Sequence, residues 1–114
     1  MSADALSEFP TIKIPASLPD VKVQMRVPAV LFNGMLNSVI GYGMRGVLWY
    51  QGESNRMAYD TYPQLFESMH KDWVKKWKIG EFPVYFAQIA PYGYNDTNNN
   101  SAYMRETQAR IAKT

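Results

Sequence analysis

The residues of this chain best suited to chemistry lie where the apolar run 46–50 stops and the polar segment Gln51-Gly52-Glu53-Ser54-Asn55 begins. Ligands of open α/β sheets bind outside the carboxyl ends of the strands, so this pattern predicts a site at residues 51–55. The amide of Gln51 and the main-chain N–H of Gly52 are hydrogen-bond donors. Such donors stabilise negative charge that develops on a reacting oxygen atom by about 3 to 4 kcal/mol each in a dry site. The alternative is that Gln51 only satisfies a turn.

The two residues that follow Gly52 offer a carboxylate and a hydroxyl. Glu53 would orient a histidine, hold the Gln51 side chain or bind substrate hydroxyls, and a local cap on the next turn is the simpler alternative. Ser54 is not expected to be a nucleophile. Residues 52–56 lack the second glycine of a nucleophile elbow, and no base lies nearby in the sequence.

General-base and metal chemistry have few candidates in this sequence. The single histidine, His70, stands beside Met69 and three residues before Trp73, on an expected helix, where a polar surface residue is the usual interpretation. With one histidine and no cysteine, a zinc site would need carboxylates, and we find no suitably spaced cluster. We predict no metal and no cofactor.

The elements that must position residues 51–55 are two strands and a long helix. Apolar runs predict strands at 46–51 and 84–90, and the first has the continuous pattern expected for a strand covered on both faces. Between them, Thr61 and Gln64 form a capping-box pattern before a helix expected at 62–78. The apolar stripe of this helix, at intervals of three and four residues, consists of Tyr62, Leu65, Phe66, Met69, Trp73 and Trp77.

The flanking segments are predicted from prolines, glycines and helical spacing. Pro10, Pro15 and Pro19 break up residues 1–27, which we expect to be an extended connector. Apolar spacing predicts a helix over 28–40, ended by the glycines at 41 and 43, and a final helix over 102–113.

A strand, a helix and a second strand predict a right-handed βαβ unit, so the fold class is α/β with a parallel sheet. Two strands leave both edges of that sheet open, and the sheet is therefore incomplete in this chain. Either further strands come from sequence outside it, or the chain pairs with another copy through its edges. We interpret residues 28–114 as the central portion of a domain.

Composition excludes several classes of partner. The 114 residues suit one small domain, and twelve Lys and Arg against ten Asp and Glu give a net charge of +2. Neither nucleic acid nor an anionic membrane is the expected partner. No run approaches the roughly 20 apolar residues that span a bilayer. Residues 1–10 lack the pattern of a secretory signal. Because the sequence has no cysteine, it does not indicate the redox compartment.

Several motifs together resemble the sialate O-acetylesterase family, a branch of the SGNH (GDSL-like) hydrolases. The resemblance covers roughly three quarters of the chain, and its most specific part is the string Trp-Tyr-Gln-Gly-Glu-Ser-Asn at residues 49–55. Val74 departs from the pattern, since the family commonly has arginine there. The other matching segments are 31–35, 46–48, 71–73, 82–83, 88–92 and 105–108.

The resemblance implies a carbohydrate O-acetylesterase on a flavodoxin-like three-layer α/β/α fold. Gln51 stands where other SGNH hydrolases have asparagine, which implies an oxyanion role. Such enzymes use a serine in a Gly-Gln-Ser-Asn-type turn near the start of the domain and an Asp and a His in one short segment near its end, and neither segment occurs here. The chain is thus expected to be an internal fragment, inactive alone, of a parent that the resemblance makes secreted or periplasmic.

Substrate contacts are expected from residues near the strand ends. Asn55 and Tyr92 would bind an acetylated carbohydrate, with the Tyr92 and Tyr94 rings stacking on a sugar, while Arg105 would meet a carboxylate. Packing and an Arg105–Glu106 surface pair are the alternatives.

Residues 93–96 copy a Gly-x-Asn-Asp signature that is also ordinary turn chemistry, although Asn95 would lie past a strand end. A non-catalytic carbohydrate-binding or interaction module is the alternative function.

Overall fold

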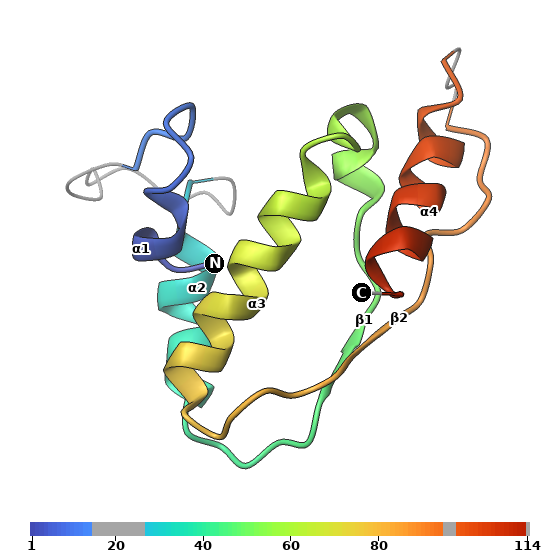
Figure 1. Cartoon of the computed structure of the whole chain (residues 1–114). Coiled ribbons are helices and arrows are strands. Elements are labelled where there is room, and N and C mark those ends of the chain that lie inside the picture. Colours follow the sequence, from blue (N-terminus) through green and yellow to red (C-terminus); the bar gives the residue numbers. More distant parts are fainter. Residues whose placement is uncertain (15–26, 95–97, 114) are drawn as a thin grey trace. The chain divides into compact units, whose positions relative to one another are not determined.

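The sheet consists of two short parallel strands, β1 (Val47–Trp49) and β2 (Val84–Phe86), with Leu48 opposite Tyr85 in register (Figure 1). The structure is a computed structural model and describes residues 1–14, 27–94 and 98–113. Helix α3 lies between the two strands in the chain, as a parallel connection requires. The predicted fold class is confirmed: the chain is α/β, with a parallel sheet that is incomplete.

The chain divides into two compact units. The first, Met1–Gly43 with Ser68–Gly80, contains α1 (Ala3–Leu6), α2 (Val30–Gly34), the 3-10 helix η1 (Leu36–Val39) and the second part of α3 (Tyr62–Trp77). The second, Met44–Glu67 with Glu81–Thr114, contains both strands, the 3-10 helix η2 (Glu53–Ala58), the start of α3, and α4 (Asn100–Ile111). In the described part of the chain, no helix is long and apolar enough to cross a membrane.

Helix α1 differs from the extended connector predicted for residues 1–27. Ser2 caps it, because its Oγ accepts a hydrogen bond from the Ala5 N–H at 3.4 Å, and Leu6 is buried. The prediction depended on prolines that begin at Pro10, and these place no restriction on the first nine residues. Pro15 and Pro19 lie outside the described residues.

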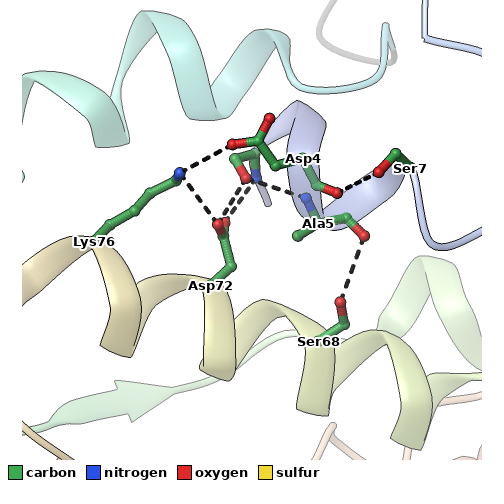
Figure 2. A network of polar contacts seen from close by, with 7 residues as sticks. Asp4, Ala5, Ser7, Ser68, Asp72 and Lys76 are labelled. Atoms are coloured by element: carbon green, nitrogen blue, oxygen red, sulfur yellow. Dashed lines mark hydrogen bonds and ion pairs between the residues drawn. The ribbon is translucent and has the colours of Figure 1, made fainter.

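A buried polar network joins α1 to α3 within the first unit (Figure 2). The Asp72 carboxylate accepts hydrogen bonds from the main-chain N–H of Ser2 at 3.0 Å and from its hydroxyl at 2.7 Å. The Lys76 ammonium lies 3.4 Å from Asp72 and 3.6 Å from Asp4. Ser68 donates a further bond to a carbonyl of α1. The network therefore fastens α1 to α3 within this unit.

The helix predicted over residues 28–40 is interrupted. Helix α2 ends at Gly34, Met35 departs from helical geometry at φ −126° and ψ −63°, and η1 follows as a tighter 3-10 turn. Asn33 and Gly34 are both weak helix formers, and glycine costs about 1 kcal/mol relative to alanine inside a helix. The apolar spacing therefore continued across a point where the local propensity does not sustain one helix.

The long helix α3 confirms the prediction, at 62–77 against an expected 62–78. Its predicted capping box is wrong. The Thr61 hydroxyl donates to the Ala58 carbonyl at 3.1 Å, and the Thr61 N–H donates to Asp60 at 2.9 Å, so Thr61 is engaged by the preceding turn and not by Gln64. The buried members of the apolar stripe are Tyr62, Met69, Trp73 and Trp77.

Both strands are shorter than predicted, and the prediction that the strand at 46–51 is covered on both faces is wrong for the described residues. Trp49 and Phe86 contact the ring of Phe66 at centroid distances of 5.8 and 4.7 Å, so one face of the sheet packs on the start of α3. On the other face, Leu48 is 87% exposed and Tyr85 is 63% exposed. Continuous apolar runs predict two covered faces, but the described chain supplies an element for only one of them.

Helix α4 begins two residues before the predicted range and contributes the core of the second unit. Met104 is fully buried beside Tyr62 and Ile89, with Tyr59, Phe66 and Ile111 packed around them. Thr107 and Gln108 are also buried on α4, although both are polar. The core thus surrounds a polar side chain, Gln108, that the local pattern did not single out.

Candidate functional site

Gly52 lies at the point where the main chain leaves β1 and passes against α4. Its φ is +143°, a conformation that L side chains rarely adopt, and it is buried. A Cβ atom there would lie 2.7 Å from the Met104 Cε and 2.8 Å from the Gln108 Nε2. Both the backbone conformation and the space therefore require glycine.

Gln108 connects the segments that follow the two strands. Its Nε2 donates to the main-chain carbonyl of Gln51 at 2.8 Å, and its Oε1 accepts from the Ile89 N–H at 3.0 Å. The residue is 0% exposed. A single carboxamide thus replaces the ladder bonds that are missing beyond β1 and β2. Gln108 belongs to the matching segment 105–108, but this role was not predicted, although its position four residues after Met104 places it on the buried face of α4.

The Gln51 side chain is exposed, and it is held at both ends of its carboxamide. Its Nε2 donates to the Asn55 Oδ1 at 2.9 Å, and its Oε1 lies 3.3 Å from the Tyr62 hydroxyl, which donates to it. An amide nitrogen carries two hydrogens, so the bond to Asn55 leaves one for a further acceptor. The sequence-predicted residues Gln51, Gly52 and Asn55 are therefore brought together in one loop.

Tyr62 lies beneath this loop and is 4% exposed. Its oxygen accepts from the Trp49 Nε1 at 2.9 Å and lies 3.3 Å from the Gln51 carbonyl. Burial raises the pKa of the Tyr62 hydroxyl, hydrogen bonding from Trp49 and Gln108 opposes this, and the charge of Glu53 adds a smaller increase. The hydroxyl is consequently protonated at neutral pH and available as a donor.

Glu53 and Arg56 lie on η2 directly after Gly52. The Arg56 Nη1 donates to the Glu53 carbonyl at 2.9 Å, and its guanidinium lies 4.4 Å from the centroid of the Tyr94 ring. This cation–π contact connects η2 with the segment after β2. The half-buried Glu53 carboxylate has no hydrogen-bond partner among the described residues.

Arg105 and Tyr92 occupy the side of the site that follows β2. The Arg105 Nη1 donates to the Ile89 carbonyl at 2.7 Å, and the Gln88 side chain donates to the Arg105 carbonyl at 2.7 Å, so Arg105 holds the extended chain after β2. Tyr92 is 71% exposed, and its ring meets that of Tyr94 edge to face at 5.2 Å. Asn95 lies outside the described residues.

Two further residues, Ser54 and His70, were considered for chemistry from the sequence. Ser54 is exposed on η2. His70 is on α3, in the unit that does not contain residues 51–55. Across 1–14, 27–94 and 98–113, no group of three or more His, Cys, Asp or Glu residues is arranged to hold a metal ion.

A parallel α/β sheet with hydrogen-bond donors presented where its strands end is an arrangement that hydrolases use. Residues 29–114 match the family described as carbohydrate esterase, sialic acid-specific acetylesterase, and the chain belongs to this family. The sialate O-acetylesterase of Mus musculus is 33% identical over an alignment of 72 residues, and the match covers 56% of this chain and 13% of that protein. The chain therefore spans a small part of the relative's length. No solved structure matches the chain.

Proposed function

We propose that the protein containing this chain hydrolyses O-acetyl esters of carbohydrates, with a serine nucleophile and an Asp and His pair outside these residues. In this proposal, the chain supplies oxyanion donors at Gln51 and Gly52 and is inactive alone. Family membership and the relative's name support esterase chemistry. The observation that carries the assignment of the site is the exposed Gln51 carboxamide, held at its oxygen and by one of its N–H groups.

The geometry suits an oxyanion because the donor is fixed before the reaction. A tetrahedral intermediate carries a full negative charge on the former carbonyl oxygen, and preorganised donors stabilise it without reorganisation. The second Nε2 hydrogen of Gln51 is such a donor, since Asn55 and Tyr62 restrict the side chain. The main-chain N–H of Gly52 is the second, in a conformation that the close approach of α4 maintains.

The neighbouring residues would then bind the sugar. The Glu53 carboxylate suits substrate hydroxyls or the support of a histidine, and the exposed Tyr92 ring offers an apolar face to a sugar ring. Asn55 would act through Gln51 as well as on substrate. Arg105 uses donors on Ile89 and Gln88, and its remaining N–H groups would meet an acidic substrate group.

The test is Gln51→Ala in the full-length protein, assayed with an acetylated sugar. We expect kcat to fall by about 10²- to 10³-fold, the cost of one oxyanion donor, while KM changes little. Gln64→Ala is the matched control, since Gln64 is an exposed glutamine on α3. An unchanged kcat in Gln51→Ala would remove the oxyanion assignment. Sugar binding by a wild-type protein with no turnover would favour the non-catalytic binding module.

A further inference from the structure

The Tyr62 hydroxyl faces two acceptors of the same residue. It lies 3.3 Å from the main-chain carbonyl of Gln51 and 3.3 Å from the side-chain Oε1 of Gln51. A phenol has one hydrogen, so it can satisfy only one of these oxygens at a time. Which oxygen receives it decides whether the Gln51 carboxamide is held.

Two neighbours restrict where that hydrogen points. The Trp49 Nε1 is a donor only, so the Tyr62 oxygen must accept at that contact of 2.9 Å and its hydrogen must point elsewhere. The main-chain carbonyl of Gln51 already accepts from the Gln108 Nε2 at the shorter distance of 2.8 Å. The Gln108 amide cannot be reversed, because its Oε1 has to accept the main-chain N–H of Ile89. A carbonyl oxygen can accept two hydrogen bonds, but this one already has a donor in Gln108, whereas among the described residues the Gln51 Oε1 has its donor in Tyr62 alone. The hydrogen of Tyr62 is therefore assigned to the Gln51 Oε1.

We infer that Tyr62 and Gln108 are positioning residues that together fix the orientation of the Gln51 carboxamide, with Oε1 held inside and Nε2 presented outside. This inference rests on the oxyanion role proposed above. Gln108 satisfies the carbonyl, which frees the Tyr62 hydrogen, and the hydrogen then anchors the side-chain oxygen.

The reversed amide would be unfavourable on both sides. Its N–H groups would face a Tyr62 oxygen already engaged by Trp49, and the phenol hydrogen would face a donor. Its oxygen, which carries a partial negative charge, would face the Asn55 Oδ1 and the developing oxyanion, and both would repel it. The orientation of the Gln51 amide therefore affects the rate of the reaction as well as the stability of the core.

A double-mutant cycle in the full-length protein tests this inference. We expect Tyr62→Phe to lower kcat for an acetylated sugar by about tenfold, since a misplaced catalytic group costs up to about 10²-fold, and to leave KM within about twofold. In a Gln51→Ala background the same substitution should have no further effect on kcat, because there is no carboxamide to orient. Tyr103→Phe is the control, as Tyr103 is 47% exposed on α4.

The outcomes separate this inference from the proposed function. If Gln51→Ala alone leaves kcat unchanged, the oxyanion role fails. If Gln51→Ala lowers kcat but Tyr62→Phe has no effect, or multiplies the loss in the double variant, only the positioning role is overturned. Should Tyr62→Phe not fold, a crystal structure of the wild-type full-length protein treated with a methylphosphonate ester decides. We expect the Tyr62 hydroxyl on the Gln51 Oε1 and the phosphoryl oxygen on Nε2, and any other partner for Oε1 overturns the inference.

Discussion

The two units of this chain each contain a polar network at a helix, and the networks differ in whether a hydrogen-bond donor remains for a ligand. In the first unit, Asp72 is buried and its two oxygens accept both hydrogen bonds of Ser2 as well as the Lys76 ion pair. In the second, Gln108 is equally buried and its amide is used at both ends. Its Nε2 binds the main-chain carbonyl of Gln51, and the side-chain amide of Gln51 is exposed and retains an N–H.

This difference distinguishes a structural network from one suited to function. A carboxylate whose acceptor sites are engaged by the protein has little capacity left for a ligand, and its loss is felt as stability. A carboxamide that the protein restrains while one hydrogen remains is a preorganised donor. Charge alone is therefore the poorer guide here, because the charged network binds α1 and the neutral one positions the candidate site.

The largest effect that sharpens this comparison is expected from Gly52→Ala. The substitution places a methyl group 2.7 Å from Met104 and 2.8 Å from Gln108 on a backbone with φ of +143°. Strain and overpacking should lower the free energy of unfolding by about 2 to 4 kcal/mol. They should also displace Gln51 from the Tyr62 hydroxyl and the Gln108 amide, which donate hydrogen bonds to it. Urea unfolding and kcat measure the two effects.

The matched control for that substitution is Gly34→Ala. Gly34 lies in α2, and a Cβ atom there would meet nothing within 4 Å. Alanine in a helix is favoured over glycine by about 0.5 to 1 kcal/mol, so the variant should be neutral or slightly more stable. Equal unfolding midpoints for Gly52→Ala and the wild type would show that the approach of α4 to the loop is not rigid.

A smaller effect, confined to stability, is expected from Asp72→Ala. Removing the carboxylate leaves the Ser2 N–H and hydroxyl without their acceptor, which should cost about 1 to 3 kcal/mol of unfolding free energy. We expect kcat to stay within about twofold, because Asp72 belongs to the other unit. Glu81→Ala, at an exposed position, controls for loss of a negative charge. A kcat loss matching that of Gln51→Ala would erase the distinction between the two networks.

Local patterns predicted the features that depend on nearby residues. The stripe from Tyr62 to Trp77 gave α3 to within one residue, and the apolar run before Gln51 located β1 and its loop. The same patterns failed where two signals compete. Apolar spacing continued through Gly34, but the helix ends there. The Thr61 hydroxyl was predicted to cap α3, but it donates to the carbonyl of Ala58.

The support of the candidate site was beyond local patterns because it depends on contacts distant in sequence. Gln108 reaches the carbonyl of Gln51 across 57 positions, and Arg105 reaches that of Ile89 across 16. Only the folded chain shows that Gln108 faces both strand ends, or that Arg105 holds the segment after β2. The predicted substrate role of Arg105 remains a prediction, now with a structural role beside it.

The smallest effect we expect is a change in the pH dependence of stability that isolates Tyr62. Burial raises the pKa of its hydroxyl above the ordinary value near 10, so the folded chain keeps this proton at a pH where the unfolded chain loses it. The stability that this proton contributes is complete below pH 10 and is lost as the pH rises through the folded pKa. Urea unfolding between pH 8 and a pH above 10 should therefore show a steeper decline in the wild type than in Tyr62→Phe. Tyr103→Phe should decline like the wild type, and parallel curves for all three proteins would mean that the Tyr62 hydroxyl is not enclosed beneath the Gln51 loop.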